Sequence, residues 1–106
     1  MKALLMAIGM TALASTPALA ETNCTGIPQA TKVGEYGAQE GYLIVTLNNM
    51  DFRLGPANDS GAKARLAVVT AALAANKQVM LRFFEYGDCA GASAARAVPN
   101  STQILQ

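Results

Sequence analysis

The sequence predicts a small, mainly β domain with one helix: an OB-like five-stranded barrel in the order β-β-β-α-β-β. Two observations lead to this fold class. Short segments with alternating apolar residues lie before and after a single long helical segment, residues 60–76. Three strands, one helix and then two strands is the order of an OB barrel. An open antiparallel sheet with one helix across it has the same order, and the barrel is preferred because closure removes exposed sheet edges.

The first strands of this fold are expected in residues 31–54. A Thr, Asn, Gly and Pro content predicts an irregular lead-in over residues 21–30. Asn48 and Asn49 suit a two-residue turn because asparagine tolerates the left-handed region. The expected elements are a strand at 31–36, a hairpin connection at 37–41, a strand at 42–47 and a strand at 50–54 with Phe52 and Leu54 facing inward.

The helix is predicted from a stripe of apolar residues spaced by three and four positions. This stripe is formed by Ala62, Leu66, Val69 and Leu73. Asp59 or Ser60 is expected to cap the N-terminus, and Asn76 suits the left-handed residue at the C-terminus.

The opposite face of the helix carries small apolar residues where a solvated helix usually carries charge: Ala64, Ala67, Val68, Ala71, Ala74 and Ala75. One interpretation is that alanine is a good helix former left partly exposed. The other is that this face is an oligomer interface, because an apolar patch on an exported protein usually marks one.

After the helix, two more strands are expected. Residues 79–86 alternate with apolar side chains on both faces, residues 87–97 are expected to form a loop, and residues 102–105 a short last strand.

Residues 1–20 have the pattern of a secretory signal, with Lys2, an apolar run and the small residues Ala18-Leu19-Ala20. One domain, residues 21–106, is expected to remain. The chain has eight basic and seven acidic residues, so removal of Lys2 leaves no net charge. This balance disfavours nucleic acid as a partner. No second apolar run predicts a membrane span, and the protein is expected in the periplasm or outside a bacterial cell.

Export places Cys24 and Cys89 in an oxidising compartment, where a disulfide between them is expected. The chain contains no histidine, which excludes Ser-His-Asp and Cys-His catalytic groups and histidine-bound zinc. The carboxylate pairs Glu35 with Glu40 and Glu85 with Asp88 lie at expected turns, where charged residues are normally just solvated. We therefore expect no catalytic residue, metal or cofactor.

Four aromatic residues lie at expected strand ends. Their ordinary role is packing within the strands; the alternative is a ligand site, since aromatics in a small barrel can stack on sugars or bases. They are Tyr36, Tyr42, Phe84 and Tyr86. With no net charge, a sugar is favoured over a nucleic acid.

The stretch from Ala64 to Cys89 runs from a helix ending Ala-Ala-Asn-Lys into Val-Met-Leu-Arg-Phe-Phe and a Gly-Asp-Cys turn. It resembles the B subunits of bacterial toxins, in particular subtilase-cytotoxin and pertussis-like B subunits and their small exported relatives. The resemblance covers about a third of the mature chain. It implies an OB fold, a ring of five subunits, glycan binding on the outer barrel surface and a toxin A-type partner subunit.

The function expected from these observations is that of a non-enzymatic exported binding module that self-associates and has glycan as its candidate ligand. The alternative is a monomeric or dimeric periplasmic accessory or inhibitor protein. An enzyme is the third and least favoured class.

Overall fold

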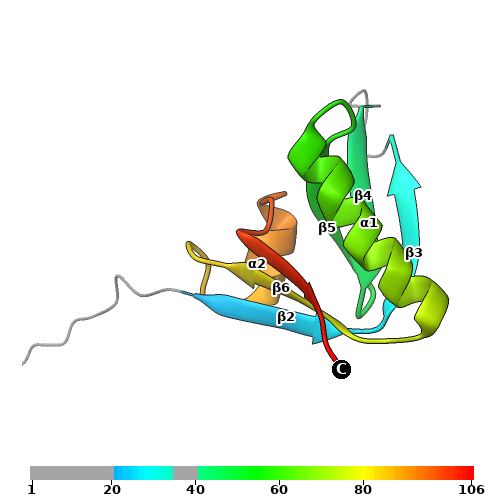
Figure 1. Ribbon diagram of the computed structural model, residues 1–106. Coiled ribbons are helices and arrows are strands. Elements are labelled where there is room, and N and C mark those ends of the chain that lie inside the picture. Colours follow the sequence, from blue (N-terminus) through cyan, green and yellow to red (C-terminus); the bar gives the residue numbers. More distant parts are fainter. Residues whose placement is uncertain (1–20, 35–40) are drawn as a thin grey trace, which may run out of the picture.

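The computed structural model describes residues 21–34 and 41–106. These residues form six strands, arranged as two three-stranded antiparallel sheets, and two helices (Figure 1). The elements are β2 (Thr22–Gly26), β3 (Pro28–Val33), β4 (Tyr42–Leu47), β5 (Met50–Pro56), α1 (Ser60–Ala75), β6 (Val79–Phe83), α2 (Cys89–Ala94) and β7 (Ser101–Ile104). The predicted mainly β class is confirmed, but the predicted single five-stranded barrel with one helix is wrong.

One sheet is a meander in the order β3-β4-β5. Its β4–β5 turn consists of Asn48 and Asn49, with φ of 54° and 63°, so the predicted left-handed turn is confirmed. Leu47 therefore pairs with Met50 across the turn. Phe52 and Leu54 are fully buried, as expected. The predicted connection at 37–41 lies mostly outside the described residues.

The other sheet has the order β2-β6-β7 and joins segments that are far apart in the sequence. The prediction of an irregular lead-in at 21–30 is wrong, because residues 22–26 pair with β6 and β3 begins at Pro28. The sequence Thr-Asn-Cys-Thr-Gly has no apolar alternation that marks a strand, and its strand conformation depends on pairing with β6. Only Ile27 separates β2 from β3, so one continuous stretch of chain supplies a strand to each sheet.

Helix α1 covers the inward face of the β3-β4-β5 sheet (Figure 1). Its predicted N-cap is confirmed, since the Asp59 carboxylate accepts a hydrogen bond from the amide of Ala62. The C-cap is Asn76 in the left-handed conformation. Of the predicted stripe, Ala62 and Val69 are fully buried, and the remaining two positions are half-buried.

The core lies between the two sheets and α1. Phe52 of β5 and Phe83 of β6 stack there with ring centroids 5.7 Å apart. The buried side chains of this core are Cys24, Leu43, Val45, Leu47, Phe52, Leu54, Ala62, Val69, Ala72, Val79, Leu81, Phe83 and Ala92.

The expected loop at 87–97 instead contains the short helix α2. Asp88 caps it by accepting a hydrogen bond of 2.6 Å from the amide of Gly91. Its first residue, Cys89, forms the predicted disulfide with Cys24 of β2, and this pairing is confirmed. The loop was predicted because the segment consists of small residues. The Asp88 cap and the disulfide instead stabilise a helix there.

Side chains from the two helices occupy the outer edge of β5. Ser93 of α2 donates a hydrogen bond of 2.7 Å to the carbonyl of Asp51, and Arg65 of α1 donates one of 2.7 Å to the carbonyl of Leu54. In the described residues β7 pairs with β6 and not with β5. A closed barrel needs a strand at this edge, and these side chains take its place. Neither described helix has the length and apolar content needed to cross a bilayer.

Candidate functional site

The outward face of the β3-β4-β5 sheet carries the largest set of interacting polar side chains described here. Alternation along β4 directs Leu43, Val45 and Leu47 into the core and the residues between them outward. Pairing with β3 and β5 adds neighbours on the same side. We call this surface the outer face; it consists of Lys32, Tyr42, Ile44, Thr46, Asp51 and Arg53.

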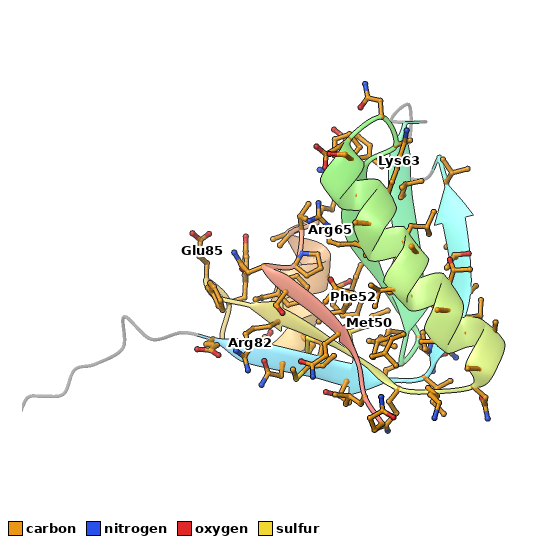
Figure 2. The ribbon with its side chains drawn as sticks, viewed as in Figure 1. Met50, Phe52, Lys63, Arg65, Arg82 and Glu85 are labelled. Carbon is orange, nitrogen blue, oxygen red and sulfur yellow. A yellow bond between two sulfur atoms is a disulfide. The ribbon has the colours of Figure 1, made fainter. Side chains whose placement is uncertain are left out.

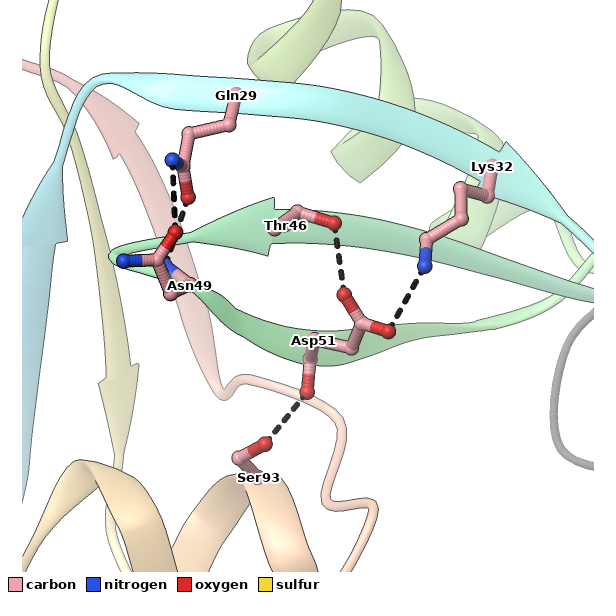
Figure 3. A network of polar contacts seen from close by, with 6 residues as sticks. All are labelled: Gln29, Lys32, Thr46, Asn49, Asp51 and Ser93. Carbon is pink, nitrogen blue, oxygen red and sulfur yellow. Dashed lines mark hydrogen bonds and ion pairs between the residues drawn. The ribbon is translucent and has the colours of Figure 1, made fainter.

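Asp51 is the centre of a polar network on the outer face (Figure 3). Its carboxylate accepts a hydrogen bond of 2.7 Å from Thr46 and forms an ion pair of 2.9 Å with Lys32. The hydrogen bond from Lys32 lowers the pKa of the Asp51 carboxyl below its ordinary value; the Thr46 hydrogen bond and the Lys32 charge act in the same direction, and partial desolvation opposes them. Asp51 is therefore an ionised, hydrogen-bonded carboxylate held in one position.

A second pair of side chains extends the polar surface to the turn end of the sheet. Gln29 donates from its amide nitrogen to the Asn49 side chain over 3.1 Å and accepts from the Asn49 backbone amide over 2.7 Å (Figure 3). These two bonds join β3 to the turn between β4 and β5. They hold two exposed amide side chains in fixed orientations.

The other end of the outer face carries an aromatic ring. The Arg53 guanidinium carbon lies 3.7 Å from the centroid of the Tyr42 ring, which is a cation–π contact. Between this pair and the Asp51 network lies Ile44, which is fully buried although it points outward. Its cross-strand partners Lys32 and Arg53 carry long aliphatic stems, which can cover apolar surface.

The four predicted aromatic candidates do not form one site. Tyr42 lies on the outer face, Phe84 follows β6 in the other sheet and is 51% exposed, and Tyr86 packs against the core. Tyr36 lies outside the described residues. Of the candidates that the structure describes, only Tyr42 lies on the same sheet face as the Asp51 network.

The helix face predicted as an interface is on the molecular surface. Its five alanines are exposed and its valine is half-buried. Basic and hydroxyl side chains flank it, and α1 carries no acidic residue. The face consists of Ala64, Ala67, Val68, Ala71, Ala74 and Ala75, as predicted from the sequence.

The expected carboxylate pairs show no catalytic arrangement in the part of the chain that is described. Glu85 is exposed, and the Asp88 carboxylate is engaged in capping α2. Glu35 and Glu40 lie outside the described residues. Across residues 21–34 and 41–106, no three His, Cys, Asp or Glu side chains are grouped so as to hold a metal ion.

Sequence reasoning missed the Lys32–Asp51–Thr46 network. A signal for part of it was present, because Thr46 and Asp51 stand at equal distances from the Asn48-Asn49 turn and must therefore pair across the hairpin. Lys32 could not be placed in the same way, since it lies on a strand whose register depends on the rest of the sheet.

We compared the chain with protein-family models, curated proteins and solved structures. No family model matches the chain, and neither the curated proteins nor the solved structures contain a significant match.

Proposed function

We propose that this protein is an exported, non-enzymatic binding module that self-associates through α1 and binds a polar ligand, with glycan as the ligand class, on its outer face. The observation that carries the proposal is the separation of two surfaces. An uncharged helix face lies on one side of the β3-β4-β5 sheet, and a fixed polar network with an aromatic ring lies on the other.

The helix face supports self-association because its side chains are too small to hold a partner surface away. Alanines at 64, 67, 71, 74 and 75 are exposed, so a second copy could bring its backbone close to α1 and bury apolar surface. Self-association is also what the sequence resemblance to toxin B subunits implies. A ring of five subunits and an A-type partner are proposals that follow from that resemblance.

The outer face supports glycan binding because it combines an aromatic ring with fixed hydrogen-bonding groups. Sugars present apolar C–H faces and hydroxyl edges, which match Tyr42 and the Asp51 network respectively. Lys32 and Asp51 neutralise each other, so this part of the face attracts neither phosphate backbones nor cations strongly.

Self-association is tested by the mass of the oxidised chain, residues 21–106, in light scattering across a dilution series. Ala71→Glu places a charge in the middle of the helix face and is expected to dissociate the oligomer. Thr70→Glu adds the same charge at the flank of the same helix and is the matched control. A monomer at all concentrations would refute self-association and favour the accessory or inhibitor alternative.

Glycan binding is tested separately on an immobilised glycan array. Tyr42→Ala is expected to abolish binding, whereas Phe84→Ala removes an exposed aromatic ring from the other sheet and is expected to leave binding unchanged. No binding by the wild-type chain, or equal loss in both variants, would contradict the assignment of the outer face.

A further inference from the structure

A small cavity lies between α1 and the start of β7, away from the outer face. Its volume is about 160 Å³, and one wall comes from the first half of α1 while the other comes from the segment that leads into β7. Figure 2 shows Arg65 on the side of α1 that faces this segment. The lining residues are Ala64, Arg65, Val68, Pro99, Asn100, Ser101 and Thr102.

The polar side chains of this cavity are rich in hydrogen-bond donors. The hydroxyl oxygen of Thr102 is buried and has no hydrogen-bond partner in the described part of the protein. Thr102 pairs with the fully buried Leu81, so its side chain is on the inward side of the sheet. An unpartnered buried hydroxyl is costly, and a bound acceptor would satisfy it.

Two neighbours add donors to the same space. Arg65 uses its Nε for the carbonyl of Leu54 and lies 3.6 Å from Asp59 through Nη2. The side-chain oxygen of Asn100 accepts from the amide of Phe84 over 2.9 Å, which leaves its amide nitrogen as the group that can donate to a ligand. Among residues 21–34 and 41–106, no acidic side chain lines the cavity.

The remaining lining is apolar and consists of Ala64, Val68 and Pro99. A ligand that fits must therefore have an acceptor-rich head and a short apolar body. We propose that this cavity binds a carboxylate on a short aliphatic chain, with the carboxylate against Arg65 and Thr102. Inorganic phosphate matches the donors but would leave the apolar wall uncovered, and the cavity is smaller than the about 300 Å³ typical of drug-sized ligands.

The test is a titration of the isotopically labelled oxidised chain, residues 21–106, with propionate and separately with phosphate, followed by amide chemical shifts. Propionate is expected to give saturable shifts at residues 64–68 and 99–102, with a dissociation constant on the order of millimolar for so small a ligand. Phosphate is expected to bind at least about tenfold more weakly. No saturable propionate shift at these residues, or equal binding of phosphate, would overturn the proposal.

Two helix variants give a matched comparison. Ala64→Leu fills the cavity and is expected to weaken propionate binding by about tenfold or more. Ala67→Leu makes the same change at an exposed position of the same helix that does not line the cavity, and is expected to bind like wild type. Both alanines belong to the helix face, so the mass of each variant is measured to separate this site from self-association. Equal binding by the two variants would refute the site.

The Thr102→Val variant tests whether the Thr102 hydroxyl contacts the ligand or has only a structural role. The variant is expected to have a higher Tm, because it removes a buried unpartnered group, and to bind propionate more weakly than wild type. A higher Tm with unchanged binding would refute the role of Thr102.

The carboxylate can belong to a free small acid or to an acidic side chain of another protein. N-acetyl-glutamate N-methylamide carries the side-chain form and is titrated in parallel with propionate. Tighter binding of propionate would identify a free acid as the ligand, and tighter binding of the glutamate derivative would identify a protein side chain.

Discussion

Removal of the Cys24–Cys89 disulfide should cost a large share of the stability of this small domain. The bond closes a loop with a sequence separation of 65 residues. The chain-entropy relation gives about 4 kcal/mol for a loop of that size at 25 °C. For domains of this kind the total stability is about 5–15 kcal/mol, so the loss amounts to between about a quarter and most of it.

The local structure gives a second reason for this loss. The disulfide fixes the first residue of α2, whose six residues are too few for a helix to be stable alone. When α2 detaches, Ser93 no longer donates to the carbonyl of Asp51, and Ala92 leaves the core. The β5 edge is then open at that position.

The assay is equilibrium urea unfolding of residues 21–106, followed by circular dichroism, with the oxidised chain compared to a Cys24→Ala, Cys89→Ala double variant. The expected difference in the free energy of unfolding is about 4 kcal/mol. Reductant should destabilise the wild-type chain by a similar amount and leave the double variant unchanged, which is the control. A difference below about 1 kcal/mol would refute the loop-closure reasoning.

Three further changes test other parts of the fold. The hydrogen bond with Lys32 lowers the pKa of Asp51 in the folded protein. The ionised Asp51 carboxylate should therefore stabilise the folded state fully above about pH 4, and this contribution should be lost as the pH falls through the folded-state pKa. In acid unfolding, the stability difference between wild type and Asp51→Asn should therefore shrink on the acidic side; a constant difference would contradict this. Asn76→Ala should destabilise by about 1 kcal/mol because φ is 57°, whereas Asn76→Gly should be neutral or stabilising in thermal unfolding. Gly55→Ala should destabilise by about 1–3 kcal/mol, because φ is 126° and the new Cβ would lie 2.9 Å from the Ala62 Cβ; a stability equal to wild type in urea unfolding would show that the backbone around Gly55 adapts.

Local chemistry was sufficient to predict the parts of the fold that depend on neighbouring residues. The Asn48-Asn49 turn, the Asp59 cap and the left-handed Asn76 each follow from the conformational preference of one residue type. The disulfide followed from the number of cysteines and the expected compartment. None of these features requires knowledge of distant segments.

The features that were missed all depend on contacts between distant segments. β2 is polar and gains its strand conformation from β6, and the open β5 edge is occupied by Arg65 and Ser93 from two helices. Hydrophobic alternation reports burial of a strand face and carries no information about what lies at the strand edge. The barrel prediction failed at that point.

The single-residue link at Ile27 has a consequence for the order of folding. All strands of the β3-β4-β5 sheet lie within residues 28–56, so this sheet can assemble from local contacts. β2 pairs with β6, which is separated from it in sequence by more than half of the described chain. Contacts between such distant segments form slowly, so β2 is expected to become ordered after the β3-β4-β5 sheet. We therefore expect pulsed hydrogen exchange during refolding to protect β3, β4 and β5 before β2. β2 leads directly into β3 through Ile27. Once the β3-β4-β5 sheet has formed, it therefore fixes the position of the C-terminal end of β2, and the β2-β6-β7 sheet forms next to that fixed end.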